Sequence, residues 1–473
     1  MERERPRRNK AASIKRKLAS AVAAGIISAE FSGLGSVTLQ PPSYRLEARV
    51  YPPHIIAASY NPDVDQPTYF DKFTLDPTPN ISTEKIAESQ VDKWQPPWGS
   101  SALIVYPWTR NPEFNGGTWQ GSYWIDNHSN PPHSWINDIM PIYKINPDGT
   151  ITPSKQLYSS DDPVYWERVM IMAKHMNIPI LFLSNWGVNS KTDLAGQKIY
   201  EFASSEANPH KLVRLAPLYE RDGDGNPSVQ RLVKWVNHYK SYAENNPHAY
   251  RNPDTGKLIV SAYSLDEDWP EMVQRWRQVE EITGVEVLLR PYGNKQIKDF
   301  IAGFHGPETF GAFPYRPAEP VEVIEQNGKI WKQISAKFEK FGEGAPRLPE
   351  NPQRFIRGVL ANVKNPAALT TFILDEIGEG TGLLPGLRVI FTSQGIYIDW
   401  EHSYGFLYVN ILHRLLPPLP EIVSDFDLAF HHNRSKVLSS GNLADKRKQE
   451  AVIWADNRLS KITFPALTNL NSQ

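Results

Sequence analysis

The feature that most constrains the fold of this chain is a repeated alternation of short apolar runs with helix-like segments, which begins near Ser101. The apolar runs are continuous rather than alternating, as expected for strands that are buried on both faces. We predict strands at 102–106, 180–185, 211–219, 257–263, 285–291, 300–304 and 369–374, with a weaker one at 388–392. Helices are predicted at 162–176, 194–205, 228–244, 267–283 and 352–363.

This alternation predicts a parallel sheet, because a helix between two strands returns the chain to the same end of the sheet. Seven or eight strands favour an α/β fold with a closed (β/α)8 TIM barrel, and 473 residues suffice for such a barrel with extensions. A doubly wound open sheet is the alternative. It is disfavoured because no glycine-rich phosphate loop follows any of the strands.

We place the barrel at residues 96–414 and expect further regions within and around it. Residues 30–95 are rich in proline, serine and polar residues and are predicted to form an extended N-terminal arm that wraps the barrel. Residues 307–351 interrupt the alternation and are predicted to be a loop insertion over one end of the barrel. Residues 415–473 are predicted to be a C-terminal extension, or tail.

Residues 1–29 have the layout of an export signal. Eight arginine or lysine residues lie between Met1 and Lys17, and a short apolar stretch of small residues ends at Ala29. This layout predicts a secreted, periplasmic or cell-surface protein that is cleaved after Ala29. The alternative is a basic tail that stays attached and binds a protein partner or an anionic surface, in a cytoplasmic or particle-associated protein.

The composition excludes several classes of function. The chain has no cysteine, which excludes disulfides, thiolate catalysis and cysteine-ligated metals. Its net charge of −1 gives no general attraction to nucleic acid, and no apolar run reaches the roughly 18 residues of a membrane-spanning helix. The histidines show no metal-ligand spacing, so we predict neither a metal nor another cofactor.

Aromatic and acidic residues recur where the predicted strands end. In chain order they are Tyr106, Trp108, Trp119, Trp186, Tyr219, Glu220, Tyr263, Tyr292, His305, Asp375, Glu376 and Glu379. In a parallel barrel the C-terminal ends of the strands converge on one mouth. Aromatic rings stack on sugar faces and carboxylates bind hydroxyl groups, so the pattern predicts a sugar-binding cleft. Ordinary packing and solvated acids are the alternative.

Acids on two of these strand ends suggest glycoside chemistry. Breaking a glycosidic bond needs a proton donor for the leaving oxygen and a second carboxylate that attacks or stabilises the anomeric carbon. We predict Glu220 as the acid and Glu376 as the base or nucleophile, with Glu379 in reserve. The other strand-end residues, including Asp375, are predicted to bind substrate.

Five segments between residues 101 and 386 carry a further signal, and they keep their order along the chain. They are Val105-Tyr-Pro-Trp108, Leu157-Tyr-Ser-Ser-Asp-Asp-Pro163, Leu183-Ser-Asn-Trp-Gly187, Ala216-Pro-Leu-Tyr-Glu220 with Asn226-Pro-Ser228, and Thr371-Phe-Ile-Leu-Asp-Glu-Ile-Gly-Glu-Gly-Thr381. They are similar to the motifs Tyr-Tyr-Pro-Trp, Tyr-Ser-Ser-x-Asp-Pro, Ser-Trp-Trp-Gly, Pro-Tyr-Tyr-Glu with Asp-Pro-Ser, and Thr-Phe-Asn-Glu-Trp-Gly-Glu-Gly-Thr. The chain therefore resembles the glycoside hydrolase family 99-like (WbsX-like) barrels, which are related in style to family 71.

The resemblance implies a retaining, endo-acting α-mannosidase or α-mannanase that cuts inside a polysaccharide or glycan. The family's usual pair of catalytic glutamates lies in a Glu-Pro-Tyr-Glu segment, and only the second has a counterpart here, Glu220. Pro217 stands three residues earlier, with Ala216 before it, and Asp375 and Ile377 replace the family's Asn and Trp. A catalytically inactive barrel that serves as a glycan-binding or structural subunit is therefore the alternative.

Overall fold

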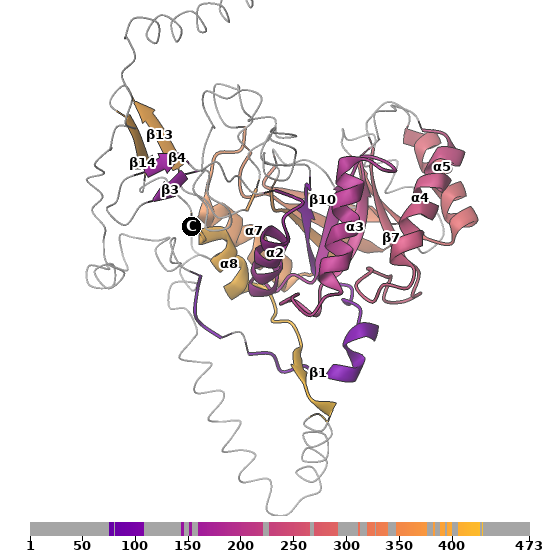
Figure 1. Ribbon diagram of the computed structural model, residues 1–473, viewed down its shortest axis with the longest axis horizontal. Helices are drawn as coiled ribbons and strands as arrows, with labels where there is room; N and C mark the ends of the chain where they lie inside the picture. The colour runs from indigo at the N-terminus through magenta and orange to yellow at the C-terminus, as the bar shows by residue number, and fades with distance from the viewer. Residues whose placement is uncertain are drawn as a thin grey trace, which may run out of the picture. The chain divides into compact units, whose positions relative to one another are not determined.

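The computed structural model describes residues 75–79, 81–107, 143–145, 151–153, 159–220, 227–264, 269–291, 311–312, 319–326, 328–338, 347–375, 382–383, 388–392, 395–399, 405–425 and 428. Its largest sheet is built from β2 (Ser101–Val105), β5 (Ile180–Asn185), β6 (Arg214–Tyr219), β7 (Ile259–Ser264), β8 (Glu286–Pro291), β9 (Gly311–Ala312), β10 (Val321–Gln326), β11 (Lys329–Ile334) and β12 (Leu369–Ile373). The nine strands follow the order β10-β11-β12-β2-β5-β6-β7-β8-β9. Figure 1 shows β7 and β10 of this sheet together with the helices of the fold.

The fold is mixed α/β, and its main sheet is curled and almost entirely parallel. Every neighbouring pair runs parallel except β10 with β11. The parallel pairing of β12 with β2 brings a late strand of the chain beside the first strand of the sheet, as a (β/α)8 barrel requires. Cα atoms of the edge strands β9 and β10 come within 8 Å of each other. No strand pairing joins these two edges within the described ranges, so closure of the barrel stays a prediction.

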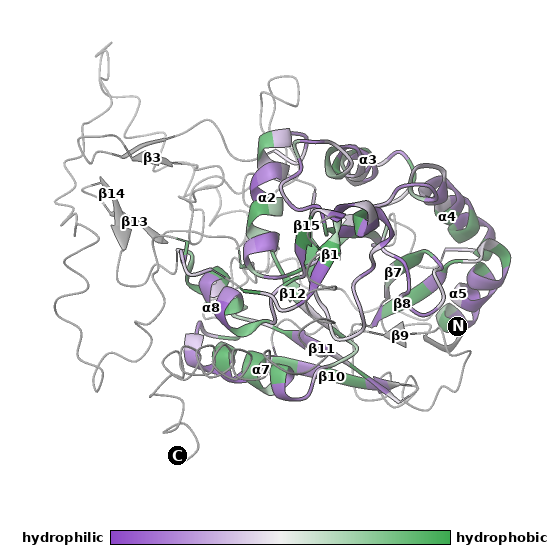
Figure 2. Cartoon of the chain, turned by 90° about the horizontal axis from the view of Figure 1, so that it is seen from below, coloured by the Kyte–Doolittle hydropathy of each residue, from purple (hydrophilic) through white to green (hydrophobic). Residues whose placement is uncertain are grey.

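The helices that alternate with the strands form a layer around the sheet. They are α2 (Pro163–His175), α3 (Lys191–Ala203), α4 (Val229–Ala243), α5 (Trp269–Thr283), α7 (Pro352–Lys364) and α8 (Leu407–Leu415). Contacts link α7 to α8, α8 to α2, α2 to α3, α3 to α4, and α4 to α5. Figure 2 shows these helices arranged around the strands.

Local sequence explains where several of these helices begin. The predicted start of α2 is confirmed, because the Asp162 side chain accepts a hydrogen bond from Val164 N–H and Pro163 occupies the first helical position. Ser190, Ser228 and Asn351 cap α3, α4 and α7 in the same way. Each side chain satisfies a backbone N–H that has no partner inside its helix.

Both faces of the central strands are buried. Alternate residues, such as Ala102 and Ile104 of β2 or Ala216 and Leu218 of β6, belong to one hydrophobic core cluster. The residues between them, such as Leu103, are also inaccessible to solvent. The helices cover that other face, since α3 contacts β5, α5 contacts β8 and α7 contacts β11. This double burial accounts for the continuous apolar runs in the sequence.

Two segments differ from the sequence-based prediction. Residues 388–392 do form a strand, β13 (Arg388–Thr392), but it pairs with β14 (Gly395–Asp399) in a hairpin outside the main sheet. The segment 307–351, predicted as a loop insertion, contains the hairpin of β10 and β11, and β11 joins the sheet through β12. The hairpin was missed because β10 alternates exposed valines with buried residues instead of forming a continuous apolar run.

Segments before and after the sheet strands are joined to each other. β1 (Lys85–Ala87) pairs in parallel with β15 (Glu421–Val423), and a short 3-10 helix, η2 (Glu88–Lys93), follows β1. Nearby, Arg414 of α8 forms an ion pair with Asp76. The structure describes residues 75–79 and 81–95 of the predicted N-terminal arm, whereas its remaining residues and residues 1–29 lie outside the described residues.

His413 of α8 completes this junction. Its two ring nitrogens each lie 2.8 Å from a backbone carbonyl oxygen, one of His175 and one of Thr78. These contacts join α8 to the end of α2 and to the segment that precedes β1. The ring stacks on that of His175 at 3.9 Å, and burial, followed by the charge of His413, lowers the pKa of His175 to about 4.

Within the described ranges, no helix combines the length and apolar character needed to cross a membrane.

Candidate active site

On several strands, the apolar residues that face the interior are followed by a polar residue at the C-terminal end of the sheet. Successive strand residues point to opposite faces, so every second residue shares the interior face. Counting on by two from core residues of β2, β6, β8 and β12 leads to Tyr106, Glu220, Arg290 and Asp375. Four strands therefore present polar groups at the mouth where a parallel barrel places its active site.

Glu220 and Arg290 form an ion pair inside the protein. Arg290 Nη1 lies 3.8 Å from Glu220 Oε1, and the two side chains are 1% and 8% exposed, respectively. The same Nη1 donates a hydrogen bond to the Tyr106 hydroxyl at 3.0 Å. Removing one member of a buried ion pair leaves the other charge uncompensated, so these residues depend on one another for stability.

Asp375 extends this arrangement to the other side of Tyr106. Its Oδ1 accepts a hydrogen bond from Tyr106 N–H at 2.7 Å, and its Oδ2 accepts one from the Tyr165 hydroxyl of α2 at 2.8 Å. Burial raises the pKa of Asp375 to about 6, although these two donors favour the charged form and oppose the rise. The result is a continuous polar network from Glu220 through Arg290 and Tyr106 to Asp375.

The raised pKa of Asp375 makes stability depend on pH. Its pKa in the fold, about 6, exceeds the ordinary value of 3.8, so its contribution is fully present below pH 3.8 and is lost as the pH rises through 6. We expect the native chain to gain about 2 to 3 kcal/mol relative to an Asp375→Asn variant when the pH falls from 7 to 4. Urea unfolding of both proteins at the two pH values measures this difference. A stability difference that does not change with pH would contradict the assigned burial of the charge.

Six of the predicted site residues lie in the described part of the chain. Tyr106, Glu220 and Asp375 belong to the network above. The Trp186 side chain, at the end of β5, is 42% exposed. Tyr263 of β7 is partly buried against the hydrophobic core.

Tyr219 has a different position from the one expected of a substrate-binding residue. It is 1% exposed, and its ring contacts Trp235 of α4 and Trp276 of α5 at centroid distances of 4.9 and 5.8 Å. It therefore faces the helix layer. The alternation of the strand gives the reason, because Glu220 is the inward residue and its neighbour must point outward.

The remaining predicted site residues lie outside the described residues: Trp108, Trp119, Tyr292, His305, Glu376 and Glu379. Their roles stay predictions, and so does the separation between Glu220 and a second catalytic carboxylate.

Two members of the network were not predicted from the sequence. Arg290 lies within an apolar run and continues the interior row of Leu288. A charged residue two positions after a buried core residue was the available signal. Tyr165 comes from the first turn of α2, and no local pattern links it to Asp375, which is 210 positions away in the sequence.

Among the described residues, no group of three or more histidine, aspartate or glutamate side chains is arranged to hold a metal ion. The polar groups that meet at the mouth are instead two carboxylates, one guanidinium and two phenols. Such a set can transfer protons, bind hydroxyl groups and stabilise charge.

Comparison with known proteins gives similarities at the level of solved structures. No family model matches the chain, and no curated protein matches its sequence. The chain is similar to a glycoside hydrolase family 99 endo-α-mannosidase from Bacteroides thetaiotaomicron, with 13% identity, coverage of 67% of this chain and 96% of that chain, and a TM-score of 0.44. A structure of a family 99 endo-α-mannosidase from the same organism in complex with bis-tris propane has the same identity and coverage and a TM-score of 0.43.

A third structure, described as a glycoside hydrolase-like protein, has 10% identity, covers 75% of this chain and 99% of that chain, and gives a TM-score of 0.41. Family 99, to which the two endo-α-mannosidases belong, is the family that the five sequence motifs resemble.

Proposed function

We propose that this chain is a glycoside hydrolase-like protein that cuts inside an α-linked polysaccharide or glycan by carboxylate acid and base catalysis. The observation that carries the proposal is that two paired strands are followed by a carboxylate residue, Glu220, and by an exposed aromatic residue, Trp186. Asn185 of β5 is paired with Tyr219 of β6, and Glu220 N–H donates to the Asn185 carbonyl at 2.9 Å. Glu220 and Trp186 are the next residues along the two strands, so a sugar stacked near the indole would lie near the carboxylate.

The proposed chemistry divides the work between two carboxylates. Glu220 is the proposed proton donor to the leaving oxygen, and Glu376, with Glu379 in reserve, is the proposed base or nucleophile. A separation of about 5 Å between the two carboxyl groups would give retention, and about 6.5–9.5 Å would give inversion. The contact of Glu220 with the guanidinium of Arg290 also allows the reverse assignment, in which Glu220 is the base or nucleophile and Glu376 is the acid. The acidic and basic limbs of a pH–rate profile distinguish the two assignments.

A product screen tests the proposal. The purified chain and a Glu220→Gln variant are incubated with α-mannans, α-1,3- and α-1,4-glucans and mixed bacterial exopolysaccharides, and released oligosaccharides are identified by mass spectrometry. We expect internal cleavage products from the native chain and none from the variant. Equal release by both proteins, or exclusively single-sugar products, would contradict an endo-acting enzyme that uses Glu220.

A second candidate function is a catalytically inactive barrel that binds glycans or serves as a structural subunit. Two observations favour it. Ala216 and Pro217 occupy the region where the resembled family has its first catalytic glutamate, and Ala216 is fully buried in the core. Glu220 itself is engaged by Arg290 in a buried ion pair. Glycan binding by both proteins in the screen, without release by either, would establish this second function.

We also propose that the protein acts outside the cytoplasm, on the basis of the predicted export signal in residues 1–29. N-terminal sequencing of the protein recovered from fractionated cells tests this proposal. A mature N-terminus at residue 30 in an extracytoplasmic fraction is expected, and an intact N-terminus in the cytoplasm would contradict it.

A further inference from the structure

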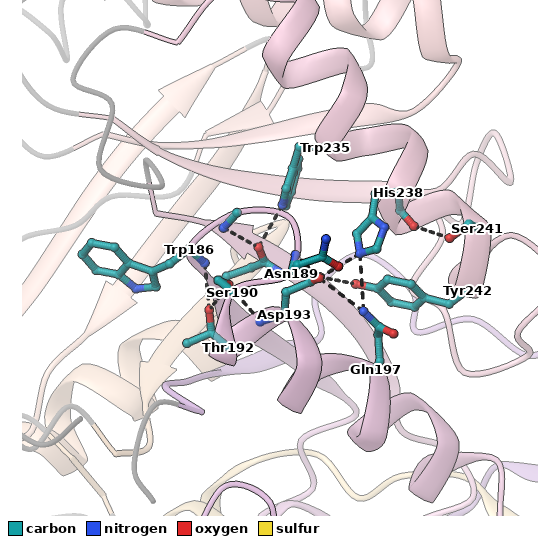
Figure 3. Close-up of polar contacts among 12 residues, drawn as sticks. Trp186, Asn189, Ser190, Thr192, Asp193, Gln197, Trp235, His238, Ser241 and Tyr242 are labelled. Carbon is teal, nitrogen blue, oxygen red and sulfur yellow. Dashed lines mark hydrogen bonds and ion pairs between the residues drawn. The ribbon is translucent and has the colours of Figure 1, made fainter. Parts of the chain in front are cut away.

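A cluster of polar side chains lies directly behind Trp186, outside the network of Glu220 and Asp375 (Figure 3). Its centre is Asp193, the third residue of α3, whose side chain is 1% exposed. Oδ2 accepts hydrogen bonds from Asn189 N–H at 2.9 Å, from His238 Nε2 at 2.8 Å and from Gln197 Nε2 at 3.2 Å. Oδ1 accepts from Asn185 Nδ2 at 3.1 Å. One carboxylate thus gathers donors from the end of β5, the following loop, α3 and α4.

The same cluster fixes the backbone that carries Trp186. Trp186 N–H donates to Thr192 Oγ1 at 2.8 Å, and Gly187 N–H donates to Asn185 Oδ1 at 2.9 Å. That oxygen also accepts from Trp235 Nε1 at 2.9 Å. Because its amide group donates to Asp193 on one side and accepts on the other, Asn185 is held in a single orientation.

One residue of this loop, Asn189, has a backbone conformation that residues other than glycine seldom adopt. Gly187 has φ 104° and Asn189 has φ 60°, so both lie in the left-handed region. A non-glycine residue is uncommon in that region and remains there only when surrounding contacts hold it. The hydrogen bond from Asn189 N–H to Asp193 is such a contact.

The Trp186 ring itself points away from the cluster (Figure 3) and is 42% exposed. A large aromatic ring that is exposed to solvent on a fixed backbone is preorganised for binding, because little ordering remains to be done when a ligand arrives. We infer that Asp193 is a positioning residue that holds the 185–190 loop so that Trp186 stacks on the sugar unit bound beside Glu220. This inference rests on the proposed function for its ligand, but the positioning itself can be measured without one.

The first test observes the Trp186 ring directly. The chain is produced with 5-fluorotryptophan, and the 19F resonance that disappears in a Trp186→Phe variant is assigned to Trp186. In Asp193→Asn an amide replaces the carboxylate, so one acceptor oxygen is lost and an NH2 group faces the donors. We expect the Trp186 resonance to shift and to broaden or split in this variant, while the resonance of buried Trp166 in α2 stays unchanged. An unchanged Trp186 resonance would overturn the positioning role.

An Asp161→Asn variant is the matched control, because Asp161 forms an ion pair with Lys198 of the same helix α3 but lies outside the loop cluster. It removes a carboxylate that contacts α3 without touching the 185–190 loop. We expect the native Trp186 resonance in this variant. A change equal to that of Asp193→Asn would assign the effect to general disturbance of α3 and overturn the inference.

The second test measures glycan affinity in a Glu220→Gln background, in which the ligand is not consumed. The probe is the polysaccharide or oligosaccharide on which the native chain acts in the product screen. We expect roughly tenfold weaker binding for Trp186→Ala and about five- to tenfold weaker binding for Asp193→Asn, with Asp161→Asn unchanged. Native affinity in Asp193→Asn would overturn the stacking role. If the native chain binds none of the glycans, that role fails together with the proposed function, whereas the 19F result still decides whether Asp193 positions the loop.

Discussion

Replacing Glu220 with glutamine is expected to lower the rate of glycan cleavage by about 10³-fold, because a positioned general acid or base typically contributes 10²- to 10⁴-fold. Glutamine has nearly the same size as glutamate, so it fills the same space, but it leaves the charge of Arg290 without this partner and should lower stability. It cannot donate or accept the proton that the reaction moves. Initial rates of reducing-end release on the polysaccharide identified in the product screen measure the effect, and circular dichroism checks the fold.

A Glu167→Gln variant provides the matched control, because Glu167 is an exposed residue of α2. It undergoes the same chemical change on the outer surface and should cleave the glycan at the native rate. Near-native turnover by Glu220→Gln would remove Glu220 from catalysis. Loss of both activity and fold in that variant would instead make the ion pair with Arg290 a structural requirement, and an Arg290→Lys variant would then separate stability from turnover.

Acidification from pH 7 to pH 4 is expected to destabilise the native chain by about 3 kcal/mol more than it destabilises a His210→Gln variant. His210 is 1% exposed, and burial lowers its pKa from 6.5 to about 3. The neutral ring is therefore favoured in the fold. Its contribution to stability is fully present above pH 6.5 and is lost as the pH falls toward 3. Glutamine can replace the hydrogen bond that joins His210 Nε2 to the Ile178 carbonyl at 3.0 Å.

Urea unfolding of the two proteins at pH 7, 5 and 4 measures this effect. The comparison with a variant is necessary because other buried groups also titrate in this range. The pKa of His248 is lowered to about 4 by burial and adds to the loss. The pKa of Glu280 is raised to about 7 by burial and acts in the opposite direction. Parallel stability curves for native chain and variant would show that His210 does not contribute.

The strands of the main sheet and the helices between them were the elements that the sequence predicted best. β5 was predicted with both of its ends, and the predicted helix at 162–176 was confirmed as α2 (Pro163–His175). Short stretches of sequence suffice to recognise these elements, because continuous apolar runs and capping residues act within a few positions. The β10 and β11 hairpin escaped prediction because its exposed edge strand has a different pattern, and closure of the sheet depends on contacts between distant segments.

Part of the candidate site could be predicted from the sequence for the same physical reason. Strand ends mark the mouth of a parallel barrel, and that rule led to Tyr106, Glu220 and Asp375. Which face of the sheet each side chain points to follows from the alternation along the strand, and this alternation places Glu220 and Tyr219 on opposite faces. Arg290 and Tyr165 reach the site only through tertiary packing, since each bonds to a residue far away in sequence. The Asp193 cluster likewise draws on α4, which no local motif connects to the 185–190 loop.

The parallel ladder of β1 with β15 has a mechanical consequence. β1 lies before the nine-stranded sheet along the chain and β15 lies after it, and the two strands run in the same direction in a two-stranded sheet of their own. Tension applied between the preceding and following segments would therefore pull the strands past each other and load all of their hydrogen bonds at once, instead of opening them one by one. The ion pair of Asp76 with Arg414 would bear part of the same load. In a chain held at both ends, this junction would therefore carry the force before the strands of the nine-stranded sheet do.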